Sequence, residues 1–229
     1  MKAVIQAGGM GTRLRPATLV LPKPLMPVND LPVIEMLLKW LSRNGFSEVY
    51  ITIGYLGHLI RAFCGDGSQW GLTVHYSQEP EPLGTIGPLR LIREHLDDAF
   101  LVLNGDLITD LDLRSFTRFH KQHQGKLTVG VTEKRIKVDL GILESREGRT
   151  IGFQEKPVKT FQVSMGIYCM NPAILELIPP GVPFGFDDLM HRMLDRDDPV
   201  YVYKHDGLWM DIGREEDFKQ AQRVFAEGV

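Results

Sequence analysis

The chain has 229 residues, of which 43% are hydrophobic and 24% charged, a composition that excludes a disordered chain and suits a compact globule. Its 29 acidic residues outnumber its 26 Lys and Arg residues, so the net charge of −3 gives no electrostatic reason to expect a nucleic acid or an anionic membrane as partner. We expect a single domain over residues 1–229, because a chain of this length can bury one sizeable core.

The two cysteines, Cys64 and Cys169, are too few and too far apart for a disulfide framework or a metal knuckle. The N-terminus begins Met1-Lys2-Ala3 without the features of a signal peptide, and no stretch approaches 18 consecutive apolar residues. These features favour a cytoplasmic protein.

Short apolar runs rich in β-branched residues alternate with segments in which apolar residues follow a helical period. This alternation predicts an α/β fold with a parallel or mixed sheet. The predicted strands are 3–6, 49–53, 72–76, 100–103, 127–131, 163–169 and 200–203. The predicted helices are 32–43, 58–63, 88–96, 113–123, 187–194 and 215–225.

The segment 134–157 has a different sequence pattern, in which short stretches typical of extended structure are interrupted by Gly141, Gly148 and Gly152. We expect it to form a small β-rich insertion beside the main sheet. In open α/β sheets, ligands bind outside the carboxyl ends of the strands, so the functional residues are sought where strands run into loops.

The loop after the first predicted strand contains Gly8, Gly9, Gly11 and Thr12. Glycines at such a place let backbone N–H groups approach phosphate oxygens closely. The spacing fits neither the Walker loop nor the dinucleotide fingerprint. A tight turn without a ligand is the alternative interpretation.

Charge supports an anion site at this loop. Residues 1–29 contain Lys2, Arg13, Arg15 and Lys23 but no acidic residue, in a chain that is acidic overall. Because Arg and Lys neutralise phosphate charge, this segment is suited to a polyphosphate.

Six motifs occur in an order that resembles the sugar-1-phosphate nucleotidyltransferases, and most closely the mannose-1-phosphate guanylyltransferase-like members. They are residues 8–16 with 22–25, 83–85, 104–106, 155–157, 166–168 and 209–213. The resemblance implies a Rossmann-like, doubly wound mixed sheet of the nucleotide-diphospho-sugar transferase type. It also implies transfer of a nucleotidyl group from a nucleoside triphosphate to a sugar-1-phosphate. The chain ends soon after the last motif, so we expect no C-terminal β-helix domain.

Two aspartates are candidate ligands of Mg²⁺. Asp106 follows a predicted strand, and Asp211 lies in an extended stretch that ends at a glycine. Two carboxylates suffice for a Mg²⁺ ion that takes its other ligands from water and substrate phosphates. Each taken alone could be a turn residue or helix cap; the resemblance assigns both to the metal.

The loop 78–85 follows a strand and is a natural place for a nucleobase pocket. Gly84 and Thr85 would lie close to the base, and the resemblance assigns a base contact to Glu79. A carboxylate only accepts hydrogen bonds, which suits the N–H donors of guanine and favours GTP. An exposed acidic loop, or a uridylyl- or thymidylyltransferase, remains an alternative.

The resemblance assigns the sugar phosphate to Gly141, Glu155 and Lys156, with Ser164 where many members have an asparagine. This departure leaves the identity of the sugar open. Arg13 and Lys23 are assigned to the phosphates at the reacting centre. A non-catalytic nucleotide-sugar-binding subunit is the alternative from another class, and homo-oligomerisation is left open.

Overall fold

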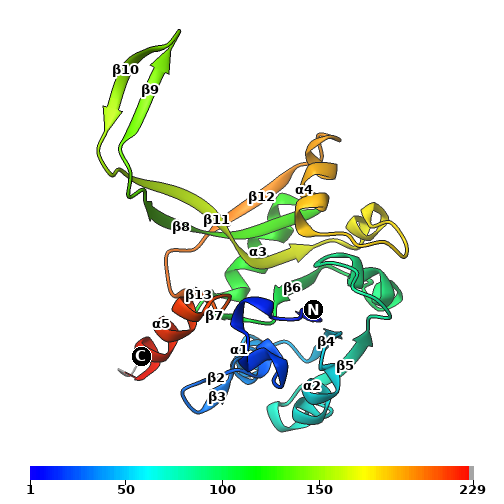
Figure 1. The fold of residues 1–229 in the computed structure, drawn as a ribbon. Coiled ribbons are helices and arrows are strands. Elements are labelled where there is room, and N and C mark those ends of the chain that lie inside the picture. Colours follow the sequence, from blue (N-terminus) through cyan, green and yellow to red (C-terminus); the bar gives the residue numbers. More distant parts are fainter. Residues whose placement is uncertain (227–229) are drawn as a thin grey trace.

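A computed structural model describes residues 1–226 and has a seven-stranded central sheet (Figure 1). The strands are β1 (Lys2–Ala7), β4 (Glu48–Ile53), β5 (Thr73–Gln78), β6 (Phe100–Asn104), β8 (Leu127–Lys137), β11 (Val158–Met170) and β12 (Val200–Lys204). Their order is β12-β8-β11-β6-β1-β4-β5. Each predicted strand corresponds to one of them.

The sheet is mixed, as predicted. β1 is parallel to β4 and β6, β4 is parallel to β5, and β8 is parallel to β12, whereas β11 runs antiparallel to both β6 and β8. After β1 the chain proceeds to β4 and β5 on one side, and β6 lies on the other side. The loops at the carboxyl ends of β1 and β6 therefore diverge, which leaves room for a ligand between them.

Helices cover both faces of the sheet, which confirms the doubly wound fold. They are α1 (Val33–Arg43), α2 (Gly57–Cys64), α3 (Leu113–His123), α4 (Phe186–Leu194) and α5 (Glu215–Ala226). Side chains of β1 alternate between the two cores: Ala3 and Ile5 pack with α1, α2 and α3, whereas Val4 belongs to the core that contains α4. Within residues 1–226, every helix is too short or too polar to cross a membrane.

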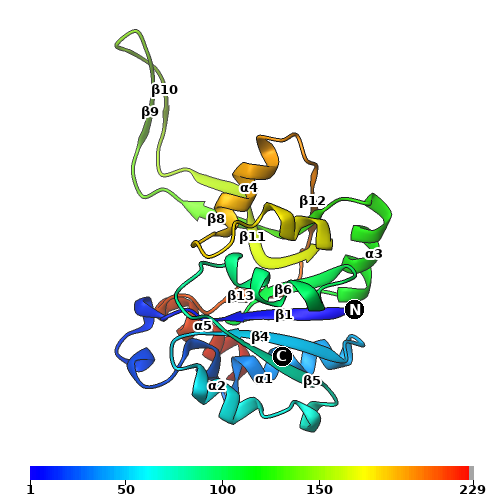
Figure 2. The same cartoon turned by 90° about the vertical axis from the view of Figure 1, so that its right-hand side faces the viewer.

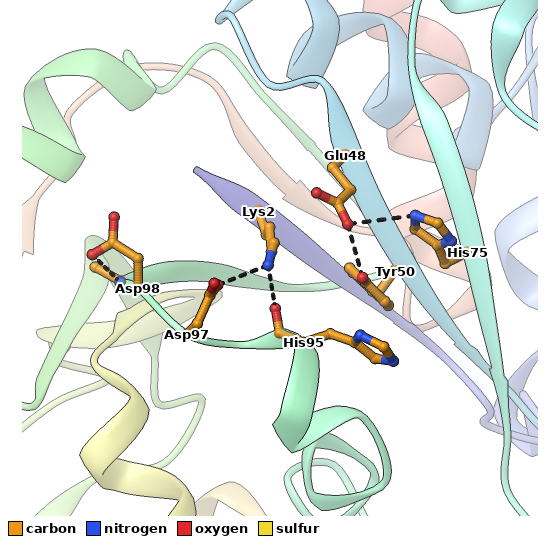
Figure 3. A network of polar contacts seen from close by, with 8 residues as sticks. Lys2, Glu48, Tyr50, His75, His95, Asp97 and Asp98 are labelled. Atoms are coloured by element: carbon orange, nitrogen blue, oxygen red, sulfur yellow. Dashed lines mark hydrogen bonds and ion pairs between the residues drawn. The ribbon is translucent and has the colours of Figure 1, made fainter.

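The predicted helix at 88–96 is a 3₁₀ helix, Gly87–His95, with non-helical dihedral angles at Ile92. Its end is held by polar contacts with the sheet (Figure 3): Lys2 Nζ donates to the His95 carbonyl oxygen at 2.5 Å and pairs with Asp97 at 2.7 Å. The His95 ring stacks on Tyr50. These contacts fix where the segment ends, which its periodicity could not show.

Residues 134–157 contain the hairpin of β9 (Ile142–Arg146) and β10 (Arg149–Gln154). β8 and β11 extend beyond the sheet as a two-stranded ribbon, in which Lys137 pairs with Val158. Their predicted ranges were therefore too short. Figures 1 and 2 show the hairpin rising from the ribbon's end, away from the rest of the chain.

Two small strand pairs complete the structure. β7 (Leu107–Thr109) pairs with β13 (Trp209–Asp211), and β2 (Pro27–Val28) pairs with β3 (Leu31–Pro32). Short 3₁₀ helices connect the elements at Thr12–Leu14, Ala17–Leu19, Lys23–Leu25, Ser68–Trp70 and Pro172–Leu177.

Candidate active site

A cavity of about 420 Å³ lies at the carboxyl ends of β1, β4 and β6. This is the place where the topology predicts a ligand. Most of the predicted phosphate, base and metal residues line it together. They are Gly8, Gly9, Gly11, Thr12, Arg13, Lys23, Glu79, Gly84, Thr85 and Asp106.

The glycine-rich loop forms one wall of this cavity. Gly11 has φ +60° and begins the 3₁₀ helix Thr12–Leu14, and its carbonyl oxygen accepts a hydrogen bond from Thr18 Oγ1 at 2.8 Å. A side chain at Gly9 would meet no atom within 4 Å, so the backbone there is open to an approaching group. Buried Leu14 anchors the far end of the loop. This arrangement presents the loop backbone to the cavity.

Lys23 lies between the two predicted metal ligands. Its Nζ atom forms an ion pair with Asp106 and lies 3.8 Å from Asp211 Oδ1. The two carboxylates come together because β13 pairs with β7, which directly follows Asp106. The Ile212 N–H also donates to the Asp106 carbonyl oxygen at 2.9 Å. Residues a hundred positions apart thus form one acidic pair.

One oxygen of each aspartate, Asp106 Oδ1 and Asp211 Oδ1, is buried and has no hydrogen-bond partner among residues 1–226. Burial, together with the neighbouring Asp106 carboxylate, raises the pKa of Asp211, and Lys23 and Arg13 oppose this rise. Buried carboxylate oxygens without partners are costly unless a cation or donor satisfies them. The residues present therefore fit a hard divalent cation such as Mg²⁺.

Glu79 lies against Gly8, at the first glycine of the glycine-rich loop. Its Oε2 atom accepts a hydrogen bond from the Leu83 N–H at 3.0 Å, while its Oε1 atom lies so close to Gly8 that a side chain there would collide with it. Burial raises the pKa of Glu79, and the hydrogen bond from Leu83 partly offsets this. The carboxylate is thus held at the cavity wall.

The loop 83–87 is hydrogen-bonded to the segment that precedes α4. Ile86 N and Gly87 N both donate to the Phe184 carbonyl oxygen at 2.9 Å, and Phe184 N donates to the Leu83 carbonyl oxygen at 2.8 Å. Phe186 N donates to Thr85 Oγ1 at 3.0 Å. These bonds fix the position of the wall that contains Gly84 and Thr85.

The predicted sugar-phosphate residues do not line this cavity. Gly141, Glu155 and Lys156 lie next to the β9–β10 hairpin and are exposed, and Gly141 packs against Phe153 and Glu155. Ser164 lies nearer, because its Oγ accepts from Gly166 N at 3.2 Å and Gly166 packs against the cavity residue Asn104. The structure thus separates the two groups of predicted site residues.

Gln6, Thr52 and Asn104 also line the cavity but were not predicted as site residues. Gln6 Oε1 and Thr52 Oγ1 are buried and have no hydrogen-bond partner within residues 1–226. The signal was present in the sequence: Gln6 and Thr52 each follow the apolar middle of a strand, one residue before its end. Such residues at the ends of buried parallel strands are candidates for ligand contacts.

Comparison with known proteins places the chain in a family. A family model described as nucleotidyl transferase matches residues 2–228. The UTP–glucose-1-phosphate uridylyltransferase of Synechocystis sp. is 33% identical over 97% of this chain and 63% of its own length. The mannose-1-phosphate guanylyltransferase catalytic subunit beta of Dictyostelium discoideum is 35% identical over 100% of this chain and 66% of its own length.

The chain thus spans slightly less than two thirds of the length of these relatives. Among solved structures, HddC from Yersinia pseudotuberculosis has the same fold, with a TM-score of 0.78 at 24% identity, over 98% of this chain and 99% of the other. The resemblance seen in the six sequence motifs is confirmed: the chain belongs to the nucleotidyl transferase family, and its matched relatives include enzymes named for transfer to sugar-1-phosphates.

Proposed function

We propose that this protein transfers a nucleotidyl group from a nucleoside triphosphate, with GTP favoured, to a sugar-1-phosphate. The products are a nucleoside diphosphate sugar and pyrophosphate. The observation that carries the proposal is the convergence of Arg13, Lys23 and Asp106 on one cavity with the glycine loop. Relatives named as guanylyl- and uridylyltransferases support the same reaction class.

In this reaction an oxygen of the sugar phosphate attacks the α-phosphorus. A new P–O bond forms at the α-phosphorus. The bond between the α-phosphorus and the oxygen that bridges to the β-phosphate breaks, and pyrophosphate leaves with the electron pair of that bond. A phosphate oxygen is already a competent nucleophile, so the protein has mainly to align the reactants and neutralise charge. We assign the triphosphate to Arg13 and to the amides of Gly8, Gly9 and Gly11.

Lys23, Asp106 and Asp211 form the centre of this charge arrangement. The two aspartates would hold Mg²⁺ through the buried oxygens that accept no hydrogen bond within residues 1–226. When bound, Mg²⁺ neutralises phosphate charge. Lys23 offsets part of the negative charge of the two carboxylates in the absence of the ion, since it contacts both, and is placed to turn toward a phosphate.

Glu79 supports the preference for GTP. The cavity-lining carboxylate offers only acceptors, which match the N1–H and N2–H₂ groups of guanine better than the mixed edge of uracil or thymine. Glu155 and Lys156, next to the hairpin, are assigned to the sugar phosphate together with Gly141 and Ser164.

The testing experiment is pyrophosphate release with Mg²⁺, in which GTP, UTP, dTTP, CTP and ATP are crossed with mannose-, glucose-, N-acetylglucosamine-, N-acetylmuramic acid- and manno-heptose-1-phosphates. We expect turnover with one pair and GTP as the best nucleotide. Preference for UTP or dTTP would contradict the base assignment alone. Tight nucleotide-sugar binding without turnover on the whole grid would instead indicate a non-catalytic binding subunit.

Two variants link turnover to the cavity. Arg13→Ala and Asp106→Asn should remove turnover while circular dichroism stays unchanged, since Arg13 is exposed and the Asp106 change preserves shape. Arg43→Ala, which replaces an exposed arginine at the end of α1, is the matched control and should retain activity.

A further inference from the structure

Three polar side chains stand at one register on three neighbouring strands of the central sheet. The strands β4, β1 and β6 lie side by side (Figure 2), and Gln6 of β1 pairs with Thr52 of β4 and with Asn104 of β6. Two residues earlier on β1 and β4, Val4 and Tyr50 belong to the core on the same face of the sheet. The polar row therefore begins where this core ends, and all three of its residues line the cavity.

The side-chain amide of Gln6 has a defined orientation. Its Nε2 atom donates a hydrogen bond to the Thr85 carbonyl oxygen. Because a carbonyl oxygen only accepts, the nitrogen of the amide and not its oxygen must face Thr85. The other atom of the amide, Oε1, is buried and accepts no hydrogen bond within residues 1–226. A buried acceptor without a donor is costly, so an N–H group of a bound ligand would remove this cost.

Thr52 has an unpaired polar atom as well, but one that is less selective. Its side chain is 1% exposed, and its Oγ1 atom forms no hydrogen bond among residues 1–226. A hydroxyl group both donates and accepts, so it can match either kind of ligand atom. Gln6 Oε1 can only accept. Of these two groups, Gln6 is therefore the one that can distinguish a ligand with an N–H group from a ligand without one.

Gln6 and Glu79 meet at the same wall of the cavity. Gln6 is hydrogen-bonded to Thr85, and Glu79 Oε2 accepts from the Leu83 N–H at 3.0 Å, so the segment 83–85 positions both side chains. Both of them line the cavity. Together they bring three side-chain oxygens to this wall, two from the carboxylate of Glu79 and one from the amide of Gln6.

Guanine is the nucleobase whose donors match these acceptors in number. Its N1–H and its 2-amino group present three hydrogens side by side. A carboxylate accepts two of them, one from N1 and one from the amino group, which leaves the second amino hydrogen without an acceptor. Uracil and thymine present a single N–H on the corresponding edge. Adenine and cytosine present an amino group beside a ring nitrogen that only accepts, and a carboxylate repels that nitrogen.

We propose that Gln6 accepts a hydrogen bond from the 2-amino group of guanine and is, together with Glu79, a specificity-determining residue for GTP. This inference rests on the proposed function, which assigns the base to Glu79. A nucleotide that lacks the donor would leave Gln6 Oε1 buried and unpaired. Sites with such a group reject analogues that lack the matching hydrogen-bond partner.

The first test uses N2-methyl-GTP, in which a methyl group replaces one hydrogen of the 2-amino group. The N1–H and the remaining amino hydrogen are still available to Glu79. Titration calorimetry of the whole chain with Mg²⁺, without a sugar phosphate, gives the Kd of each nucleotide. We expect N2-methyl-GTP to bind about tenfold or more weakly than GTP, because it loses one hydrogen bond and its methyl group meets Gln6. Equal Kd values for the two nucleotides would overturn the proposal.

The second test is the variant Gln6→Ala, which removes the acceptor and leaves space for the methyl group. We expect the ratio of the two Kd values to fall to about twofold or less, because GTP loses its hydrogen bond and N2-methyl-GTP loses its steric conflict. A purely structural role of Gln6, through its bond to Thr85, would weaken both nucleotides alike and keep the native ratio. That outcome in a variant folded by circular dichroism would overturn the proposal. Gln122→Ala, at an exposed glutamine of α3, is the matched control and should keep the native ratio.

The same titrations separate this proposal from the proposed function. A native protein that binds GTP no better than UTP would contradict the base assignment and, with it, the role of Gln6. A native protein that prefers GTP over UTP but binds N2-methyl-GTP as tightly as GTP would keep the base assignment and overturn the role of Gln6 alone. Because binding is measured without a sugar phosphate, a failure of nucleotidyl transfer does not affect this result.

Discussion

Gly84 lies directly against the backbone of Phe184: a methyl group on Gly84 would stand 2.7 Å from the Phe184 carbonyl oxygen, which is closer than side-chain carbons come to other atoms. The same oxygen accepts the N–H groups of Ile86 and Gly87. Gly84 also has φ +81°. This glycine is therefore required both by its conformation and by the close approach of two chain segments that build this wall of the cavity.

Replacing Gly84 with alanine should lower the free energy of unfolding by about 1–3 kcal/mol, because the methyl group strains the backbone and displaces Phe184. Urea denaturation measures this change. Gly9→Ala is the control, since a side chain there meets no atom within 4 Å, and its unfolding midpoint should match that of the native protein. Equal midpoints for all three proteins would show that the two segments do not pack as described.

Lys23→Met should destabilise the protein at neutral pH by about 3 kcal/mol. This is the lower end of the range typical when one partner of a buried ion pair is lost. Its side chain is only 12% exposed, and Asp106 and Asp211 would repel each other without it. Added Mg²⁺ should recover much of the loss in thermal unfolding. The same change at Lys39, which forms a surface pair with Glu35, should cost about 0.5 kcal/mol or less and be insensitive to Mg²⁺.

The pH dependence of this variant follows from Asp211, whose pKa is already raised by burial and by Asp106. An acid with a raised pKa in the folded state holds its proton more tightly there than in the unfolded chain. The folded state therefore loses stability as the pH rises from the pKa of this carboxyl in the unfolded chain to its higher pKa in the folded state. The deficit of Lys23→Met should shrink as the pH is lowered toward 4, and a deficit that grew instead would contradict this account.

If the proposed base contact is correct, Glu79 should make GTP binding dependent on pH. Its pKa is raised above its ordinary value of 4.5 by burial, and only the ionised form offers all its oxygens to guanine. GTP affinity should therefore fall as the pH drops from neutrality toward that value. Glu79→Gln should remove this dependence and lower the preference for GTP over UTP about tenfold, or about 1.4 kcal/mol.

Titration calorimetry at several pH values measures both effects. Glu81→Gln is the matched control, because Glu81 is an exposed carboxylate two residues away. A native GTP affinity that is flat with pH, or an equal effect of the two substitutions, would remove Glu79 from the base site.

The sequence was sufficient for β1, β4 and β6 because these strands are buried on both faces and contain short apolar runs. It was insufficient for β7 and β13, which have three residues each and no periodicity to detect. Yet this pairing brings Asp106 beside Asp211. The motif order predicted both aspartates, but only the long-range pairing shows that Lys23 lies between them.

The position of the sugar-phosphate residues also could not be read from the sequence. Glu155 and Lys156 occur in the expected motif, but the motif says nothing of how far the β8–β11 ribbon extends before the hairpin begins. The ribbon's outer residues alternate charged and apolar side chains, a pattern that predicts extended structure without saying what covers it. The distance of Glu155 and Lys156 from the cavity therefore depends on the length of the ribbon, which the motif does not encode.

Trp209 connects β13 to β11, since its Nε1 atom donates a hydrogen bond to the Met165 carbonyl oxygen at 2.9 Å. Trp209→Phe should cost about 1–3 kcal/mol in unfolding, because Met165 is fully buried and its carbonyl loses a partner. Asp211 lies two residues later on the same strand, so the Mg²⁺ concentration for half-maximal turnover should rise. Trp40→Phe on α1 is the control, because the Trp40 indole donates no hydrogen bond within residues 1–226, and it should leave that concentration unchanged. An equal shift in both variants would show that β13 is positioned by other contacts.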